Sequence, residues 1–218
     1  MLLTVAALAL SAFLALAAYV MSRHGEVPVD VRIENFVRVH RAEWLVVMMK
    51  AVTWLGSNVV LVPVVLGVAA WFLLKRGDSR SAIELVAALV GSIILYDIAK
   101  AVVHRARPPA IYRVGYNFSG GSFPSGHSTS AIAVWGMLAF LLALRASPYA
   151  RKELFVGAAV LIVTIGASRI YLGAHWPTDV IGGFALGGAW LAGLVALDLL
   201  MRRQQGVGHP GSATLTLG

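Results

Sequence analysis

Residues 123–145 read FPSGHSTSAIAVWGMLAFLLALR, a short polar entrance followed by an apolar run. About 20 apolar residues are enough to cross a hydrocarbon core of about 30 Å, so the run from Gly126 predicts a membrane-spanning helix. The serine and histidine at its entrance stand next to lipid, where polar side chains are rare unless they have a function. The stretch therefore predicts a helical membrane fold with a reactive group at its rim.

The composition of the whole chain agrees with a membrane protein. Of its 218 residues, 59% are hydrophobic and only 13% are charged, whereas ordinary soluble domains carry about a quarter charged residues. Cysteine is absent, which excludes disulfide frameworks and thiolate metal sites. The net charge of +8 is scattered between apolar runs, which argues against a nucleic-acid partner and favours attraction to anionic lipid headgroups.

Five further apolar runs predict an all-α, polytopic fold with six transmembrane helices in one domain, residues 1–203. The first run lacks the positive charges that open a signal peptide and exceeds the usual signal core of about 7–15 residues. We interpret it as a retained anchor, with a signal peptide as the alternative. Residues 204–218 are expected to form a flexible tail. The predicted spans are residues 2–21, 54–74, 82–103, 126–145, 153–170 and 178–200.

The segment 22–53 between the first two spans is more polar. Val29, Ile33, Phe36 and Val37 fall at helical spacing among charged residues, which favours an amphipathic helix lying on the membrane surface. The alternation from Val29 to Glu34 also suits a strand, so both structures remain open from the sequence.

Loop charges predict the orientation of the spans. The loops after the second and fourth spans and the start of the tail are basic, and with six spans all three lie on one side. The positive-inside tendency makes that side cytoplasmic. We therefore expect a multi-pass protein of the cell (inner) membrane, with both termini cytoplasmic and the loops after the third and fifth spans extracytoplasmic. The basic residues are Lys75, Arg76, Arg80, Arg145, Arg151, Lys152, Arg202 and Arg203.

Three polar blocks lie in those two extracytoplasmic loops. Residues 100–108 read KAVVHRARP, residues 123–127 read FPSGH, and residues 168–179 read SRIYLGAHWPTD. Together they supply permanent cations, two histidines, a carboxylate four residues after one histidine, and a Ser-Gly helix entrance. A phosphate monoester carries about −1.5 to −2 charge near neutral pH, so these are groups that can bind it and transfer its phosphoryl group.

In form and order the blocks resemble the three-part motif of the type 2 phosphatidic acid phosphatase family (PAP2, or lipid phosphatase–haloperoxidase superfamily). They fit the family patterns K-x6-R-P, P-S-G-H and S-R-x5-H-x3-D with no position missing, and the resemblance covers roughly residues 45–200. It implies a PAP2-like helical bundle that acts as an integral-membrane lipid phosphatase. The implied substrate candidates are phosphatidate, phosphatidylglycerol phosphate and polyprenyl diphosphate.

The first block supplies two candidate phosphate ligands. Arg107 offers a planar fork to two phosphate oxygens, and Lys100 offers a compact point charge. The ordinary alternative is a helix-end cation that reaches for water or headgroups, and we assign that role to His104 and Arg105. Asp97 lies one helical turn before Lys100 and is expected to be its counter-ion.

The second block begins a span. Ser125 suits a helix N-cap, and the free N–H groups of such a helix start also attract anions, so Ser125 and Gly126 are candidates for a phosphate cradle. His127 follows, close enough to protonate a leaving oxygen. The family resemblance implies the same role of general acid for His127.

The third block contains the candidate nucleophile, His175. Asp179 lies four residues later and can accept the proton of one ring nitrogen, which leaves the other free to attack phosphorus. The alternative for Asp179 is an acid that complements the dipole of a helix beginning at Pro177. Arg169 is the third candidate phosphate ligand, and Ser168 a further hydroxyl donor.

Aromatic residues near the span ends are interpreted as interfacial anchors, and Tyr171 and Trp176 also as candidates to line a headgroup pocket. Asn117-Phe-Ser119 matches a glycosylation pattern that is frequent by chance. The other interfacial candidates are Trp44, Trp54, Trp71, Tyr96, Tyr112 and Tyr116.

The blocks imply no cofactor and no metal, because Mg²⁺ prefers carboxylate-rich sites and only Asp179 is available, with Asp97 at a distance. We therefore expect a metal-independent lipid phosphatase that forms a phosphohistidine and whose partners are a lipid phosphate and membrane lipids. One alternative is a phosphotransferase that passes the phosphoryl group to another lipid. Another is a non-enzymatic lipid transporter. A haloperoxidase shares the blocks, but six spans favour lipid chemistry. The oligomeric state stays open.

Overall fold

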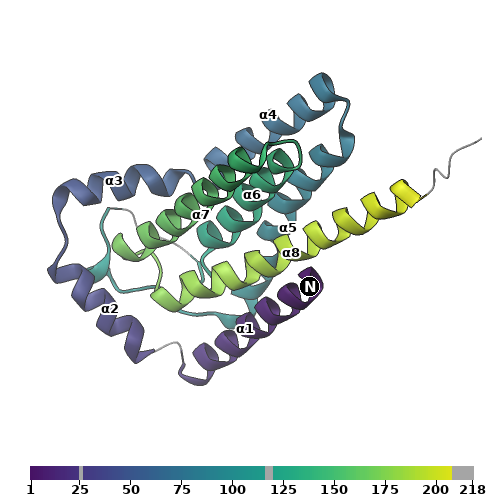
Figure 1. Ribbon diagram of the computed structural model, residues 1–218. Helices are drawn as coiled ribbons and strands as arrows, with labels where there is room; N and C mark the ends of the chain where they lie inside the picture. The colour runs from purple at the N-terminus through teal and green to yellow at the C-terminus, as the bar shows by residue number, and fades with distance from the viewer. Residues whose placement is uncertain (25–26, 116–119, 208–218) are drawn as a thin grey trace, which may run out of the picture.

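The computed structural model describes residues 1–24, 27–115 and 120–207 (Figure 1). Over these residues the protein is helical and contains no strand, and six of its helices are long and apolar enough to cross a membrane. The predicted all-α fold with six spans is therefore confirmed. The elements are α1 (Leu2–Ser22), α2 (Pro28–Val39), α3 (Glu43–Trp54), α4 (Asn58–Arg76), α5 (Ser79–Val103), the 3₁₀ helix η1 (Ala110–Tyr112), α6 (Gly126–Ala143), α7 (Pro148–Tyr171) and α8 (Pro177–Val207).

Three span boundaries differ from those expected by four residues or more. α4 starts at Asn58 rather than at position 54, because α3 and a short turn take up the preceding residues. α7 starts five residues early, since Ser147 caps it and Pro148 suits the first helical position. α8 continues to Val207, so the start of the segment expected to be a tail is helical. The remainder of that segment and the Asn117-Phe-Ser119 pattern lie outside the described residues.

The polar segment before the second span forms two helices, α2 and α3, which lie at one end of the bundle (Figure 1). The helical interpretation holds and the strand alternative is wrong. The orientation of α2 is a surprise, because its apolar Val29 and Phe36 are exposed while Asp30 and Glu34 are buried. The physical reason is a buried arginine beneath α2, described with the site.

Close packing of α6 on α8 brings two of the polar blocks together. Gly183 and Gly187, four residues apart on α8, face the first turns of α6. A Cβ atom at Gly183 would lie 2.7 Å from the Ser125 carbonyl oxygen, and one at Gly187 would lie 2.4 Å from that of Thr129. Small residues at this spacing let helix backbones approach closely. The start of α6 is thereby held against the first turns of α8.

α1 supports the same region from the other side of α8. Phe13 stacks on Phe123 with ring centroids 5.7 Å apart, and Phe123 directly precedes the Pro124-Ser125 entrance of α6. The apolar packing of α1 therefore reaches the loop that leads into the second block.

Ion pairs gather at the opposite end of the bundle, where the N-terminus of α1, the α4–α5 turn and the C-terminal part of α8 lie (Figure 1). Arg80 pairs with Glu84 at 3.0 Å and with Asp198 at 2.8 Å, and Asp198 also pairs with Arg202 at 2.6 Å. Glu84 and Asp198, two of the acids within the predicted spans, are therefore paired with arginines at this end of the bundle.

Candidate active site

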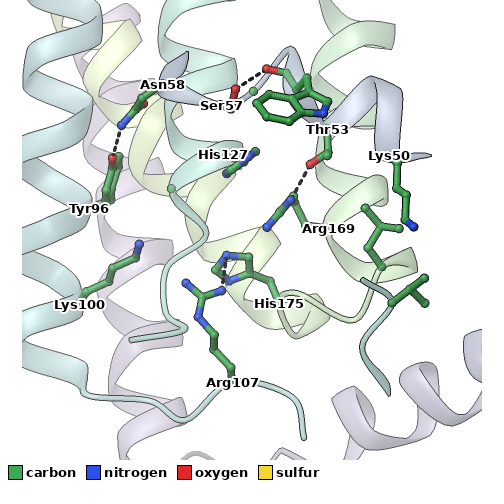
Figure 2. Close-up of a pocket in the computed structure, with 15 residues that line it drawn as sticks. Lys50, Thr53, Ser57, Asn58, Tyr96, Lys100, Arg107, His127, Arg169 and His175 are labelled. Carbon is green, nitrogen blue, oxygen red and sulfur yellow. Dashed lines mark hydrogen bonds between the residues drawn. The ribbon is translucent and has the colours of Figure 1, made fainter. Parts of the chain in front are cut away.

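Residues of all three blocks line one cavity of about 480 Å³ at the α2–α3 end of the bundle (Figure 2). Its size is within the range of about 300–1,000 Å³ that is typical of small-molecule sites. Figure 2 shows Lys100, Arg107 and Arg169 directed toward the space between the two histidines. The polar and charged lining residues are Lys50, Thr53, Ser57, Asn58, Tyr96, Lys100, Arg107, His127, Arg169 and His175.

His175 follows α7, and its ring orientation is set by two neighbours. Nδ1 lies 2.8 Å from the Ser122 carbonyl oxygen, so Nδ1 carries the proton and Nε2 keeps its lone pair. An N–H of Arg107 donates to Nε2 at 3.1 Å. Burial lowers the pKa of His175 to about 4, against the opposing effect of Asp179, and Arg107 adds to the fall. The imidazole is therefore neutral at neutral pH and has the form that a nucleophile requires.

Asp179 stands beside this ring but is not the nearest acceptor of its proton. Its Oδ2 lies 3.5 Å from His175 Nδ1, farther than the Ser122 carbonyl, so the expectation that Asp179 fixes the tautomer needs correction. Oδ2 instead accepts the Ser122 hydroxyl and, at 2.9 Å, the backbone N–H of Trp176 at the start of α8. Asp179 therefore complements the start of this helix and places a negative charge next to the ring.

The three predicted cations reach the cavity from three different elements. Arg169, in the last turn of α7, donates to the Thr53 hydroxyl of α3 at 2.6 Å. Arg107 donates to the Ala174 carbonyl at 2.8 Å. The ammonium of Lys100 lies 4.7 Å from the ring centroid of Tyr96. These contacts hold the cations around one space.

The start of α6 forms the wall of the cavity that faces these cations. Gly126 and His127 line it, whereas Ser125 is buried behind them. The Ser125 hydroxyl accepts the backbone N–H of Ser128 at 3.4 Å, as an N-cap does, and its own N–H donates to the Asp179 carbonyl at 2.9 Å. The side chain of Ser125 thus shapes the helix start instead of facing the cavity.

Three further expected members of the site are not brought to this cavity. The Ser168 hydroxyl donates to the Ile165 carbonyl at 2.6 Å within α7. The Tyr171 hydroxyl accepts the N–H of Ala42 and so anchors the turn before α3. Trp176 donates to the Ala106 carbonyl at 3.0 Å.

Burial also corrects the interfacial interpretation of some aromatic residues. Tyr96, Tyr112 and Trp176 are buried, whereas Trp44, Trp54 and Trp71 are exposed. Tyr96 receives a hydrogen bond from Asn58 at 3.0 Å and belongs to the cavity wall.

Two lining residues that the sequence analysis missed come from α3. Lys50 and Thr53 lie three residues apart in a helix that is otherwise largely apolar, so they share one face. Two polar residues at this spacing in an apolar helix could have identified them as lining residues from the sequence. The turn after α3 also touches the candidate acid, because a Cβ atom at Gly56 would lie 3.3 Å from the His127 ring.

Arg105 is the largest departure from expectation. We assigned it an interfacial role, and that is wrong, because it is only 3% exposed and lies beneath α2. Its guanidinium donates to Asp179 at 2.7 Å, to Thr178 at 2.7 Å and to Asp30 at 2.6 Å. His104 is exposed, as an interfacial residue would be.

Asp97 is exposed on α5, and its negative charge acts on the Lys100 ammonium, as expected of a counter-ion. The two form no direct ion pair within 4 Å among the residues that the structure describes. Across residues 1–24, 27–115 and 120–207, no group of three His, Asp or Glu side chains is arranged to hold a metal ion.

Fold and cavity together define a polytopic helical protein with a cationic, histidine-containing cavity at one rim of its bundle. The PAP2 superfamily matches residues 81–202, more than half of the chain. The chain is 34% identical over 156 residues to phosphatidylglycerophosphatase B of Bacillus subtilis, which covers 67% of this chain and 72% of that protein. It is 29% identical over 186 residues to undecaprenyl-diphosphatase of Sulfolobus acidocaldarius, with 83% and 84% covered.

A solved structure agrees with these similarities. The transmembrane PAP2 type phosphatidylglycerolphosphate phosphatase from Bacillus subtilis superposes with a TM-score of 0.82 at 28% identity, over 91% of this chain and 98% of that one. The chain therefore belongs to the PAP2 superfamily and is a multi-pass membrane protein.

Proposed function

We propose that this protein is a lipid phosphatase that removes phosphate from a lipid monophosphate or diphosphate through a phosphohistidine on His175. The observation that carries the proposal is the position of His175 Nε2, which keeps its lone pair in a cavity shared with four cations and a second histidine. The relatives named above, a phosphatidylglycerophosphatase and an undecaprenyl-diphosphatase, support a lipid substrate.

The first half of the reaction forms the phosphohistidine. Lys100, Arg107 and Arg169 bind the phosphate oxygens, and Arg107 turns its N–H from Nε2 to one of them. Nε2 attacks phosphorus as the P–O bond to the lipid breaks, and His127 donates a proton to the departing oxygen. The His175 ring becomes positive as the N–P bond forms, and the nearby carboxylate of Asp179 stabilises that charge.

The second half returns the protein to its starting form. Water attacks the phosphorus, His127 accepts the proton of that water, and the P–N bond breaks. Inorganic phosphate leaves and the neutral imidazole is restored. The apolar lining residues Trp54, Val114 and Leu172 give the cavity a surface for the non-phosphate part of the substrate.

We propose that the cavity faces the extracytoplasmic side of the cell membrane. The basic residues Arg76, Arg145 and Arg202 lie on the loops and helix end opposite the cavity, and positive loops tend to stay cytoplasmic. Substrate phosphate then reaches the site from the outer leaflet while its tails remain in lipid.

A panel assay tests the proposal. The purified full-length protein in detergent is given phosphatidate, phosphatidylglycerol phosphate and undecaprenyl diphosphate, and released phosphate is measured. Release from at least one lipid is expected, and adding an acceptor lipid should not yield a transfer product, which separates the hydrolase from a phosphotransferase. A transporter would move lipid and release no phosphate from any of them.

We expect the reaction to need no metal, because Lys and Arg side chains supply the positive charge around the phosphate. Excess EDTA should leave the rate of phosphate release within about twofold of the untreated rate, because no step of the proposed reaction uses a metal ion. Vanadate should inhibit by resembling the phosphoryl transition state. Strong loss with EDTA that magnesium restores would contradict the metal-free mechanism.

The role of His127 as general acid predicts a dependence on the leaving group. With an alkyl phosphate, whose leaving oxygen is strongly basic, His127→Ala should slow turnover by roughly 10²–10⁴-fold, the usual contribution of acid–base catalysis. With 4-nitrophenyl phosphate, whose leaving group needs no proton, the loss should be much smaller. Equal losses for both substrates would assign His127 another role.

A further inference from the structure

Behind the proposed nucleophile, three buried charges form one cluster that joins α2 to α8. The guanidinium of Arg105 bridges Asp30 Oδ2 of α2 at 2.6 Å and Asp179 Oδ1 of α8 at 2.7 Å. All three side chains are at most 1% exposed. Thr178 closes the cluster, because its hydroxyl donates to Asp30 and its backbone N–H donates to the other Asp30 oxygen at 2.9 Å.

Neither Arg105 nor Asp30 lines the 480 Å³ cavity, so neither is placed to touch substrate phosphate. Arg105 instead contacts the Asp179 oxygen that points away from the ring, while the other oxygen lies 3.5 Å from His175 Nδ1. The backbone N–H of Ser122 also donates to the Arg105 carbonyl at 2.8 Å, and the Ser122 carbonyl holds Nδ1. Arg105 therefore contacts both the carboxylate beside the His175 ring and the backbone of Ser122, whose carbonyl holds Nδ1.

We infer that Arg105 and Asp30 are positioning residues that hold the Asp179 carboxylate and keep its charge compensated, so that His175 stays unprotonated down to acidic pH. The inference rests on the proposed function, because it concerns the same reaction. The cluster as a whole has one more carboxylate than it has cations. Burial makes this balance matter, since charges interact more strongly where water is excluded.

Replacing one member of the cluster changes the net charge next to the His175 ring. Without Arg105, the two buried carboxylates behind the ring lose the arginine that they share, and the imidazolium becomes easier to form. Without the Asp30 charge, the cluster holds one carboxylate and one cation, and the imidazolium becomes harder to form. When both charges are removed together, the original net charge returns.

Other charged groups face His175 from every neighbouring element, and none of them is substituted in these variants. They are Asp179 of α8, Arg107 of the loop after α5, Arg169 of α7, His127 of α6, Lys100 of α5 and, more distantly, Lys50 of α3 and Glu34 of α2. Burial raises the pKa of Glu34 to about 8 and the Asp30 charge adds to the rise, so Asp30→Asn favours the charged form of Glu34 and restores part of the lost negative charge.

The experiment compares the pH dependence of kcat/KM in the full-length protein for wild type, Arg105→Gln, Asp30→Asn and the double variant. The acid limb is the fall of kcat/KM toward low pH as His175 becomes protonated. In Arg105→Gln this limb should move up by about one pH unit or more, which lowers kcat/KM about tenfold at pH values below the limb. The limb of Asp30→Asn should stay or move down, and that of the double variant should return toward wild type. KM should change little, because the cavity lining is intact. Substrate ionisation is common to all variants and does not affect the comparison.

Arg80→Gln is the matched control. Arg80 also bridges two acids, Glu84 and Asp198, but at the opposite end of the bundle. It should lower thermal stability without moving the acid limb. Arg105→Lys keeps the charge and should keep the limb near its wild-type position, even if Arg105→Gln folds poorly.

Two results overturn the inference. One is an acid limb that stays in place in both Arg105→Gln and Arg105→Lys while the wild type is active. The other is a double variant whose limb shifts as far as that of Arg105→Gln, because charge compensation would then be absent. A wild type that releases phosphate from no lipid would instead overturn the proposed function itself.

Discussion

Replacing His175 by asparagine is expected to reduce phosphate release by about 10⁴-fold or more, because the loss of a nucleophile removes the covalent route entirely. Asparagine approximates the ring in size and can still donate to the Ser122 carbonyl that holds Nδ1. The fold should therefore persist, and the loss should reside in kcat. Labelling provides the second readout, since wild type quenched in base after brief exposure to a ³²P-labelled substrate should carry acid-labile label that the variant lacks.

His104→Asn is the matched control for this substitution. His104 is exposed at the end of α5 and lies outside the 480 Å³ cavity, so turnover and labelling should stay close to wild type. Acid-labile label that persists in His175→Asn would place the nucleophile elsewhere in the cavity, with His127 as the next candidate.

Replacing Arg169 by alanine should lower kcat/KM by roughly 10²–10³-fold, the effect of removing one preorganised donor to a developing negative charge. Arg169 is only 4% exposed and reaches the cavity from the last turn of α7. A buried cation acts more strongly on phosphate oxygens than one in water. Arg169→Lys should recover part of the loss, because lysine keeps the charge but not the planar fork.

Inhibition by vanadate gives an independent measure of this effect, and it should weaken in parallel with kcat/KM. Arg145→Ala is the control, since Arg145 is half exposed and pairs with Asp78 at the opposite end of the bundle. Activity of Arg169→Ala within a few-fold of wild type would remove Arg169 from the phosphate site.

Much of the fold could be predicted from local composition. A run of about 20 apolar residues has few options other than a membrane helix, because its backbone must be hydrogen-bonded internally in lipid. The interfacial segment was harder to predict. Its helical period was visible in Val29, Ile33 and Phe36, but these residues face outward and Asp30 and Glu34 face inward. Hydrophobic periodicity predicts which residues share a face, and in a membrane the apolar face can point to lipid instead of the core.

The cavity, too, could be predicted only in part from the sequence. Lys100, Arg107, His127, Arg169 and His175 were candidates from their chemistry, and the structure brings them to one space. Ser168 shares the third block but points into its own helix, since a serine in a helix can donate to a preceding carbonyl. The Ser122 carbonyl that holds the His175 ring had no signal in the sequence, because every residue carries a carbonyl and only the chain path decides which one is near.

By itself the sequence determined the class of the protein, its six spans and the chemical groups available at one rim, because apolar run length and side-chain chemistry are local properties. Only the tertiary structure decided which charges pair. Arg105 meets Asp30 and Asp179 across more than 70 residues in each direction, and α6 meets α8 only because Gly183 and Gly187 permit the approach. Such pairings depend on the packing of distant segments, and the same arginine would face lipid headgroups if α2 did not cover it.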